Sequence, residues 1–281
     1  MKDRICVITG ATDGIGKAAA CSLALQGAKL LLHGRDPEKG IRAVAEVKAR
    51  SGNPAVEFLQ ADFSSLAQVR HLAGMLAERA PRIDVLINNA GGIFGKRALS
   101  QDGYEMTLAV NHLAPFLLTH LLVEQLKSGG PARIVTTASN AHRRARIHFD
   151  DLQSTRGYSP MGVYGMSKLA NILFTRALAK RLQGTSVTAT AVHPGFCRTG
   201  FGRDLQASPI VKGLFRVASL FARSAEKGAE TVVYLASSPE VQGASGGYYF
   251  DCKPIAPSAA AQDEAAAERL WQVSEQLVGI A

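Results

Sequence analysis

One stretch near the N-terminus decides the fold: Ile5-Cys6-Val7-Ile8-Thr9-Gly10-Ala11-Thr12-Asp13-Gly14-Ile15-Gly16. Its four leading apolar residues are typical of a parallel strand that is buried on both faces. A glycine-rich turn follows, then alanines and leucines at helical spacing, then a second apolar run at 30–32. This order predicts a dinucleotide site, because glycines let the backbone approach a pyrophosphate and a helix N-terminus attracts the anion.

The spacing of the three turn glycines is G-x-x-x-G-x-G rather than the commoner G-x-G-x-x-G, so an ordinary glycine turn stays open as an alternative. If the turn binds a dinucleotide, the expected cofactor contacts are Gly10, Thr12, Asp13, Gly14, Ile15 and Gly16.

The end of the second predicted strand favours NADP(H) over NAD(H). NAD sites usually place an acidic side chain there on the ribose 2′-hydroxyl, whereas a 2′-phosphate calls for a cation. Gly34 stands where the acid is expected, and the planar guanidinium of Arg35 suits a phosphate. Asp36 weakens this preference, since it could turn inward or pair with Arg35.

Apolar runs alternate with helical patterns along the rest of the chain. We expect strands at 55–60, 83–87 and 133–137, and helices at 41–50, 64–79 and around 108–114. The 281 residues show no internal repeat or low-complexity linker. The alternation therefore predicts one α/β domain over 1–281, with helices on both faces of an open parallel sheet and a ligand crevice at the carboxyl ends of the strands.

Polar and small residues follow two of these strands. Asp62, which precedes Phe63, is equally well explained as an acceptor from an adenine amino group and as the N-cap of the next helix. The fourth strand stops at Asn88-Asn89-Ala90-Gly91, whose small residues let backbone and ligand come close. We therefore expect cofactor contacts at Asp62, Phe63, Asn89, Ala90 and Gly91.

Tyr164 and Lys168 stand four residues apart in a helical pattern, which places a phenol and an ammonium on one helix face. Lowering the pKa of a phenol by about three units takes roughly 4 kcal/mol, and Lys168 could supply much of it. The bare Tyr-x-x-x-Lys pattern is more often a solvated pair. Likewise, Asn111 could be a satisfied core amide and Ser139 a capping hydroxyl.

Six motifs together resemble the short-chain dehydrogenase/reductase superfamily, and within it the retinol-dehydrogenase and WW-domain-oxidoreductase-like group. They are residues 9–16, Asn88-Asn89-Ala90-Gly91, Asn111-His112-Leu113, Ser139-Asn140-Ala141-His142, Tyr164-Gly165-Met166-Ser167-Lys168-Leu169-Ala170-Asn171 and Val192-His193-Pro194-Gly195. The resemblance implies a Rossmann fold, a doubly wound sheet of about seven strands whose last strand lies near 247–250.

The resemblance also implies roles. Tyr164 would donate a proton to a carbonyl or accept one from an alcohol, and Lys168 would lower the tyrosine's pKa and hold the nicotinamide ribose. Ser139 would polarise the substrate oxygen, and Asn111 would help hold a water in a proton relay. Further cofactor contacts are implied at Pro194, Gly195 and Thr199. The group usually carries an N-terminal membrane anchor, and no such segment precedes the first strand.

Apolar residues recur at helical spacing around 200–223, the expected substrate lid. Three explanations stay open: a helix over an apolar substrate, plain core packing, and a basic amphipathic surface that contacts a membrane. The expected substrate is a small apolar alcohol, aldehyde or ketone. The alternative function is a cofactor-binding redox sensor, which would not need the proton-transfer residues.

The net charge of +9 comes from dispersed Lys and Arg without a nucleic-acid motif, which favours a phosphorylated cofactor over nucleic acid. The cluster Arg143-Arg144-Ala145-Arg146 has no assigned role beyond a solvated loop. Four scattered cysteines predict neither disulfides nor a metal site. With no signal-peptide pattern and an apolar run at 113–126 too short and polar to span a bilayer, we expect a cytoplasmic enzyme, with a homo-oligomer left open.

Overall fold

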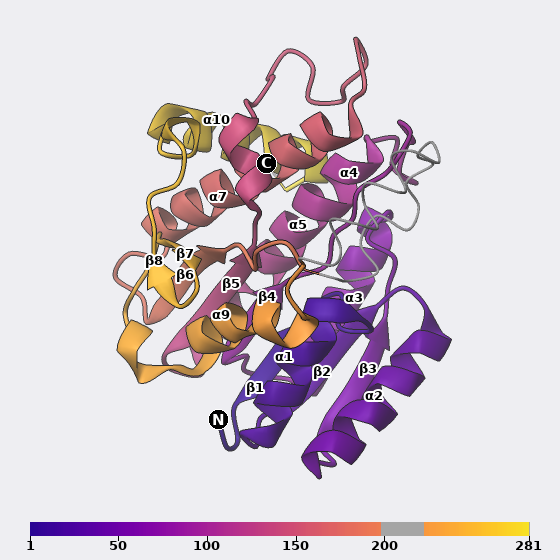
Figure 1. The fold of residues 1–281 in the computed structure, drawn as a ribbon, viewed down its shortest axis with the longest axis vertical. Helices are drawn as coiled ribbons and strands as arrows, with labels where there is room; N and C mark the ends of the chain where they lie inside the picture. The colour runs from indigo at the N-terminus through magenta and orange to yellow at the C-terminus, as the bar shows by residue number, and fades with distance from the viewer. Residues whose placement is uncertain (198–221, 281) are drawn as a thin grey trace.

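The computed structural model describes residues 1–197 and 222–280. Its strands form one sheet in the order β3-β2-β1-β4-β5-β6-β7-β8 (Figure 1). The strands are β1 (Ile5–Ile8), β2 (Lys29–Gly34), β3 (Val56–Gln60), β4 (Val85–Asn88), β5 (Ala132–Thr137), β6 (Val187–Val192), β7 (Tyr248–Phe250) and β8 (Lys253–Pro254). Strands β1 to β7 pair in parallel, which confirms the predicted doubly wound sheet.

Strand β8 was not predicted. It pairs antiparallel with β7 through Tyr249 and Phe250. Asp251 and Cys252 both have positive φ, at 47° and 59°, so the chain reverses within two residues. A strand of two residues carries too little hydrophobic pattern to be recognised in a sequence.

Helices cover both faces of the sheet. One face carries α1 (Gly14–Leu25), α2 (Pro37–Ser51) and α9 (Ala225–Ser237); the other carries α3 (Leu66–Arg79), α5 (Ala114–Leu121), α7 (Pro160–Arg181) and α10 (Glu264–Val278) (Figure 1). Strand β1 shows why its sequence is continuously apolar. Val7 joins the core on the α7 side, while Cys6 and Ile8 join the core on the α1 side.

The apolar stretch at 113–126 is not one continuous helix. The short helix α4 (Met106–Leu108) passes into a π-helix, Ala109–Leu113, before α5 begins. Helix α5 ends at Leu121, and α6 (Val123–Ser128) follows after Leu122, whose φ and ψ of −99° and 3° are not helical. π-Helical turns are uncommon and occur often at functional sites, so the segment around Asn111 is a place to look for one.

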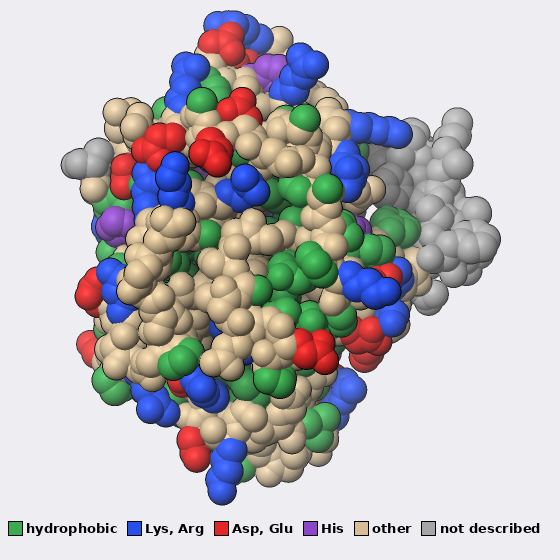
Figure 2. Space-filling model, turned by 90° about the vertical axis from the view of Figure 1, so that its left-hand side faces the viewer, with side chains coloured by type: hydrophobic (Ala, Val, Ile, Leu, Met, Phe, Trp, Pro, Cys, Tyr) green, Lys and Arg blue, Asp and Glu red, His purple; other side chains and the backbone are tan. Residues whose placement is uncertain are grey.

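The remaining described elements are short 3-10 turns at Asn140–Arg144, Pro239–Val241 and Ala259–Ala261. Basic side chains are interspersed with acidic ones on the face shown in Figure 2, as the dispersed charge of the sequence predicts. All four cysteines are free thiols.

Candidate active site

The glycine turn after β1 is packed too tightly to admit other side chains. Gly10 has a φ of +64°, and a Cβ there would lie 2.7 Å from the Cα of Ala90. A Cβ at Gly16 would lie 2.6 Å from Nδ2 of Asn89. That amide nitrogen donates hydrogen bonds to the carbonyl oxygens of Thr9 and Gly10, both at 3.0 Å. The turn is therefore held against the residues that follow β4.

The other predicted contacts of the turn surround this helix start. The Asp13 side chain caps α1 and accepts a hydrogen bond from the N–H of Gly14 at 2.7 Å. Thr12 lies over the end of β2, where a Cβ at Gly34 would come 2.5 Å from its Cγ2. Position 34 therefore has no room for the acidic side chain that NAD sites usually carry.

Arg35 and Asp36 diverge at the end of β2. Asp36 is the N-cap of α2: its carboxylate accepts the N–H of Lys39 at 3.0 Å and lies 3.7 Å from the Lys39 Nζ. The hydrogen bond from the Lys39 N–H holds the pKa of Asp36 below its ordinary value. Asp36 thus pairs with Lys39 rather than with Arg35. The Arg35 side chain is exposed, and no acidic residue in the described part of the chain forms an ion pair with it.

At the end of β3, the structure excludes one of the two explanations of Asp62, that it caps helix α3. Ser65 is the N-cap of α3, and the Asp62 carboxylate instead accepts the N–H of Ser64 at 2.9 Å. The alternative of Asp62 as the helix cap is therefore wrong, because Ser65 occupies that position.

Phe63 has a partner that was not predicted from the sequence. Its ring stacks on His33 with centroids 4.2 Å apart, and the His33 Nε2 lies 3.0 Å from the Ala61 carbonyl oxygen. Burial lowers the pKa of His33 to about 4, so the imidazole is neutral at pH 7. A lone histidine in an apolar strand gives no sign of this stacking, which depends on how β2 and β3 pair.

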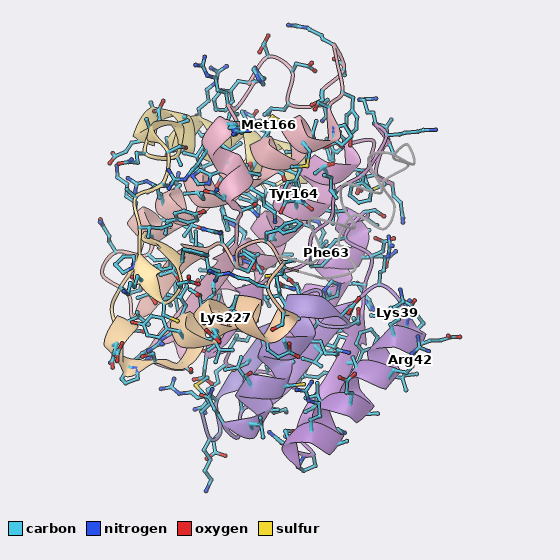
Figure 3. All side chains as sticks on the ribbon, viewed as in Figure 1. Lys39, Arg42, Phe63, Tyr164, Met166 and Lys227 are labelled. Atoms are coloured by element: carbon cyan, nitrogen blue, oxygen red, sulfur yellow. The ribbon has the colours of Figure 1, made fainter. Side chains whose placement is uncertain are left out.

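Tyr164 and Lys168 are brought together with Ser139 as predicted. Both project from α7 and are buried, at 9% and 3% exposure. The Lys168 Nζ donates to the Thr137 carbonyl oxygen at 3.0 Å and lies 5.6 Å from the centre of the Tyr164 ring. The Ser139 side chain is hydrogen-bonded to that of Tyr164. Figure 3 shows Tyr164 and Phe63 toward the same end of the sheet.

The pKa of Tyr164 is raised in this structure, whereas the sequence predicts that Lys168 lowers it. Burial raises the pKa of Tyr164 to about 12, and the hydrogen bond from Ser139 only partly offsets it. Burial also lowers the pKa of Lys168 to about 8. Desolvation disfavours the charged forms of both groups. At pH 7 the phenol therefore carries its proton, as a proton donor must.

Asn111 lies beside this pair. Its Oδ1 accepts the N–H of Gly92 at 2.8 Å, and its Nδ2 donates to the Gly92 carbonyl oxygen at 2.9 Å and to Ser167 Oγ at 3.0 Å. A Cβ at Gly91 would lie 3.1 Å from the Asn111 Oδ1 and 3.4 Å from the Lys168 Nζ. Gly91 thus lets the end of β4 approach both polar groups closely.

Sequence comparison agrees with this arrangement. A family model for the short chain dehydrogenase matches residues 4–209. This chain belongs to the short-chain dehydrogenase family. It is an oxidoreductase with a Rossmann-type sheet.

Relatives cover nearly the whole of this short-chain dehydrogenase. Retinol dehydrogenase 14 of Homo sapiens is 42% identical over 100% of this chain and 88% of its own length. DnrU of Streptomyces sp. (strain C5), named provisionally as a daunorubicin C-13 ketoreductase, is 46% identical over 98% and 93%. Among solved structures, an uncharacterised protein of Mycobacterium paratuberculosis matches with a TM-score of 0.81 and 34% identity over 99% and 94%.

A solved complex of Pseudomonas aeruginosa RhlG with NADP matches with a TM-score of 0.71 and 25% identity, over 88% of this chain and 94% of that one. The dehydrogenase chain described here has no helix, within 1–197 and 222–280, that is long and apolar enough to cross a membrane.

The nicotinamide end of the predicted site is described only in part. Gly195 has a φ of +83°, and its N–H donates to His193 Nδ1 at 3.2 Å, so the turn after β6 is fixed from within. Pro194 packs beside Gly228 of α9. Thr199 and almost all of the predicted lid around 200–223 lie outside the described residues.

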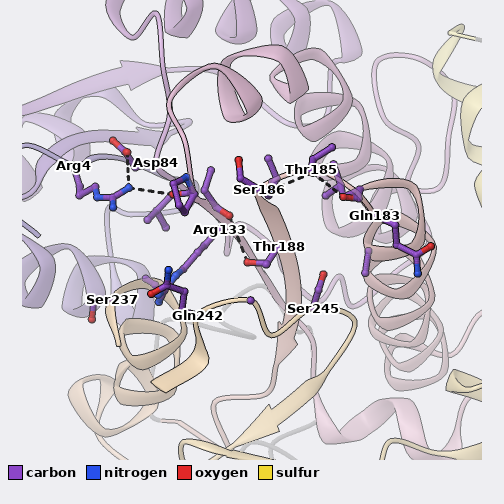
Figure 4. Close-up of a pocket in the computed structure, with 18 of the residues that line it drawn as sticks. Arg4, Asp84, Arg133, Gln183, Thr185, Ser186, Thr188, Ser237, Gln242 and Ser245 are labelled. Carbon is purple, nitrogen blue, oxygen red and sulfur yellow. Dashed lines mark hydrogen bonds and ion pairs between the residues drawn. The ribbon is translucent and has the colours of Figure 1, made fainter. Parts of the chain in front are cut away.

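The dehydrogenase has a cavity of about 490 Å³ elsewhere, at the amino ends of the central strands (Figure 4). Its lining includes Arg4, Asp84, Arg133, Thr188 and Ser245, and none of the predicted catalytic or cofactor residues. The predicted catalytic residues therefore lie near the carboxyl ends of the strands, whereas this cavity lies at their amino ends.

Proposed function

We propose that this enzyme transfers a hydride between NADP(H) and an apolar alcohol or carbonyl compound, with Tyr164 as proton donor and acceptor. The observation that carries the proposal is the cluster of Tyr164, Lys168 and Ser139 near the carboxyl ends of the strands. The glycine turn lies at the same end of the sheet. A binding module would have no use for a protonated phenol, a buried ammonium and a hydroxyl at one point.

The residues present fit a dinucleotide. The tight backbone around Gly10 and Gly16 leaves no side chain between the turn and a pyrophosphate, and the N-terminus of α1 favours an anion. At Gly91, the lack of a side chain lets the backbone lie close to Lys168 and Asn111. When bound, the nicotinamide supplies the hydride, which is chemistry that no side chain in the protein can perform.

Arg35 supports NADP(H) as the cofactor. Thr12 fills the space above Gly34, the Asp36 carboxylate is engaged by Lys39, and Arg35 is left exposed to meet a 2′-phosphate. The RhlG structure, which contains NADP, agrees with this preference.

The protein's own groups would then handle the substrate oxygen. Ser139 and Tyr164 direct two hydrogen-bonding groups at one point, where a carbonyl oxygen would accept both. In reduction, the phenol would give its proton to the substrate oxygen, and the Lys168 ammonium would stabilise the phenolate that is left. In oxidation the same proton moves the other way. Asn111 is bonded to the backbone of Gly92 and lies near Lys168, where it would help hold a water in a proton relay.

The apolar body of the substrate is supported by relatives that are named retinol dehydrogenases, since retinol is an apolar alcohol. We also propose a cytoplasmic location, for which the four free cysteines are the supporting observation.

Tyr164→Phe tests the proposal because it removes only the phenolic oxygen. NADPH oxidation with a panel of apolar aldehydes and ketones should fall about 10²- to 10⁴-fold, the usual contribution of general acid catalysis. NADPH affinity, measured by fluorescence titration, should stay within about twofold, since the ring remains in place. Equal rates in the wild type and the variant would overturn the role of Tyr164 and favour a cofactor-binding regulator.

A further inference from the structure

His142 is fully buried and lies three residues after Ser139, in the 3-10 turn Asn140–Arg144. Both of its ring nitrogens contact main-chain groups. Nδ1 lies 2.7 Å from the Ser139 carbonyl oxygen, and Nε2 accepts a hydrogen bond from the N–H of Ser258 at 3.1 Å. The imidazole thus joins the candidate catalytic serine to a segment 116 residues further along the chain.

These two partners fix the tautomer of His142. A carbonyl oxygen can only accept a hydrogen bond, so Nδ1 must carry a proton. A backbone N–H can only donate, so Nε2 must be unprotonated. The ring is therefore neutral, and a second proton on Nε2 would face the N–H of Ser258 and break that bond.

The surroundings of His142 favour the neutral form. Burial, together with the charge of Arg143, lowers the pKa of His142, and the bond to the Ser139 carbonyl opposes this only in part. The other titratable groups that face it are the Tyr248 hydroxyl of β7, 3.5 Å from Nδ1, and His193 after β6, which stacks on Tyr248. From α7, Tyr164 is hydrogen-bonded to the Ser139 side chain, and the Lys168 Nζ donates to the carbonyl oxygen of Thr137.

A second contact ties the same turn to the same segment. The Arg143 guanidinium donates to the Ala256 carbonyl oxygen at 2.8 Å and to the Asn140 Oδ1 at 2.9 Å. This gives one arginine of the basic cluster a structural role that the sequence did not suggest. The segment itself is anchored to the sheet, because the N–H of Ile255 donates to the Tyr248 carbonyl oxygen at 2.8 Å.

Ser139 depends on this turn for its orientation. Its Oγ accepts the N–H of Ala141 at 3.2 Å, and its carbonyl oxygen is held by His142. Its side chain also reaches Tyr164. The buried His33 and His112 each leave Nδ1 without a partner in the described part of the chain, whereas both nitrogens of His142 have main-chain partners, one of which belongs to Ser139.

We propose that His142 is a positioning residue, whose neutral Nδ1–H tautomer clamps Ser139 in place against the C-terminal segment 255–261. The proposal rests on the proposed function, since His142 would orient Ser139 for that reaction. Through His142, the clamp connects the C-terminal segment to Ser139.

A substitution at Ser258 can remove the single hydrogen bond between its backbone N–H and the His142 Nε2. Its φ of −65° is the value that proline prefers, so Ser258→Pro removes the donor N–H without forcing the backbone. The Ser258 Oγ is buried and has no partner in the described part of the chain. Ser258→Ala therefore serves as the matched control, because it deletes the hydroxyl and keeps the N–H.

The test compares kcat for carbonyl reduction, KM and the pH profile of Ser258→Pro with those of Ser258→Ala. In Ser258→Pro, kcat should fall about three- to tenfold, the effect of losing one hydrogen bond, with KM for NADPH unchanged. The acid limb of its kcat profile should move to higher pH. Without the N–H of residue 258, a proton on the His142 Nε2 no longer meets another hydrogen-bond donor, so His142 is protonated more easily. Ser258→Ala should match the wild type. Equal kcat and equal pH profiles in the two variants would overturn the clamp.

Two further measurements keep the inference testable if Ser258→Pro fails to fold or the proposed function fails. Ring ¹⁵N chemical shifts of His142 in the wild type should show a protonated Nδ1 and an unprotonated Nε2, and this readout requires no turnover. The opposite tautomer would overturn the clamp. His142→Asn retains an amide donor at the Nδ1 position, so it should keep at least threefold more kcat than His142→Leu; equal losses would also contradict the inference.

Discussion

Near the carboxyl ends of the strands, Lys168 is 3% exposed and its Nζ donates to the carbonyl oxygen of Thr137. Near the amino ends of the strands, Asp84 is equally buried. Its carboxylate lies 2.9 Å from Arg4 and 3.7 Å from Arg82, and it accepts a hydrogen bond from the N–H of Ile5 at 2.7 Å. The first charge has no carboxylate partner among the described residues, whereas the second is surrounded by donors.

This difference separates two uses of a buried charge. At the amino edge, the arginines and the Ile5 N–H compensate the carboxylate, so Asp84 fastens β1, β4 and the loop before β5 together. At the carboxyl edge, burial opposes the charge on Lys168 and lowers its pKa to about 8. Such an arrangement lowers stability, and it fits the catalytic role proposed for Lys168.

Asp84→Asn should give the largest change in stability. Removing the charge leaves Arg4 and Arg82 without their shared partner, and we expect unfolding free energy to fall by about 2–3 kcal/mol, the range for hydrogen bonds to charged groups. Urea unfolding followed by circular dichroism measures it. The kcat for carbonyl reduction should be unchanged below the unfolding transition; a parallel loss of kcat would mean that the two edges are coupled.

Lys168→Met should have the opposite sign. It replaces a desolvated ammonium with an apolar side chain of similar length, so unfolding free energy at pH 7 should rise by about 1–2 kcal/mol, while kcat falls at least about 100-fold. The matched pair of urea curves for Lys168→Met and the wild type supplies the measurement. A destabilised Lys168→Met would show that the Lys168–Thr137 bond outweighs the desolvation of the ammonium.

The pH dependence sharpens the same point. The folded pKa of Lys168 is about 8, against an ordinary value of 10.5. Between these values the unfolded chain binds a proton that the folded protein has released, so the lysine's unfavourable contribution is full below pH 8 and disappears as the pH rises toward 10.5. The stability advantage of Lys168→Met should therefore shrink across this window. A constant advantage from pH 7 to 10.5 would contradict the lowered pKa.

Arg35→Ala should give the smallest effect, and it acts only on the cofactor. If Arg35 meets a 2′-phosphate, NADPH affinity should fall by about 10-fold, or roughly 1.4 kcal/mol, with NADH affinity unchanged. Parallel fluorescence titrations with the two cofactors provide the comparison, and Arg42→Ala on α2 is a control for general loss of positive charge. Equal losses for NADPH and NADH would refute the 2′-phosphate role.

Much of the fold could be predicted because its evidence is local. Strands such as Ile5–Ile8 are continuous apolar runs, since both faces of a parallel sheet are buried. Glycines such as Gly10 and Gly16 mark the turn because no other residue fits. The grouping of Ser139, Tyr164 and Lys168 followed from a resemblance between motifs, and the structure brings these residues together.

The features that were missed depend on contacts between distant segments. Nothing near His142 in the sequence points to Ser258, and nothing near Phe63 points to stacking on His33. The π-helix at Asn111 arises where the side chain bonds to Gly92 in another segment. The pKa of Tyr164 was expected to fall, since spacing reveals a neighbouring lysine but not how completely both groups are buried.

The most direct test of the central claim follows the hydride itself. NADPH carrying deuterium at both C4 positions is incubated with the enzyme and an apolar ketone found by screening, and the product alcohol is analysed by mass spectrometry. We predict one deuterium at the carbinol carbon with the wild type, and at least about 100-fold less labelled product with Tyr164→Phe. An alcohol without deuterium at that carbon, or labelling that Tyr164→Phe leaves unchanged, would contradict the account.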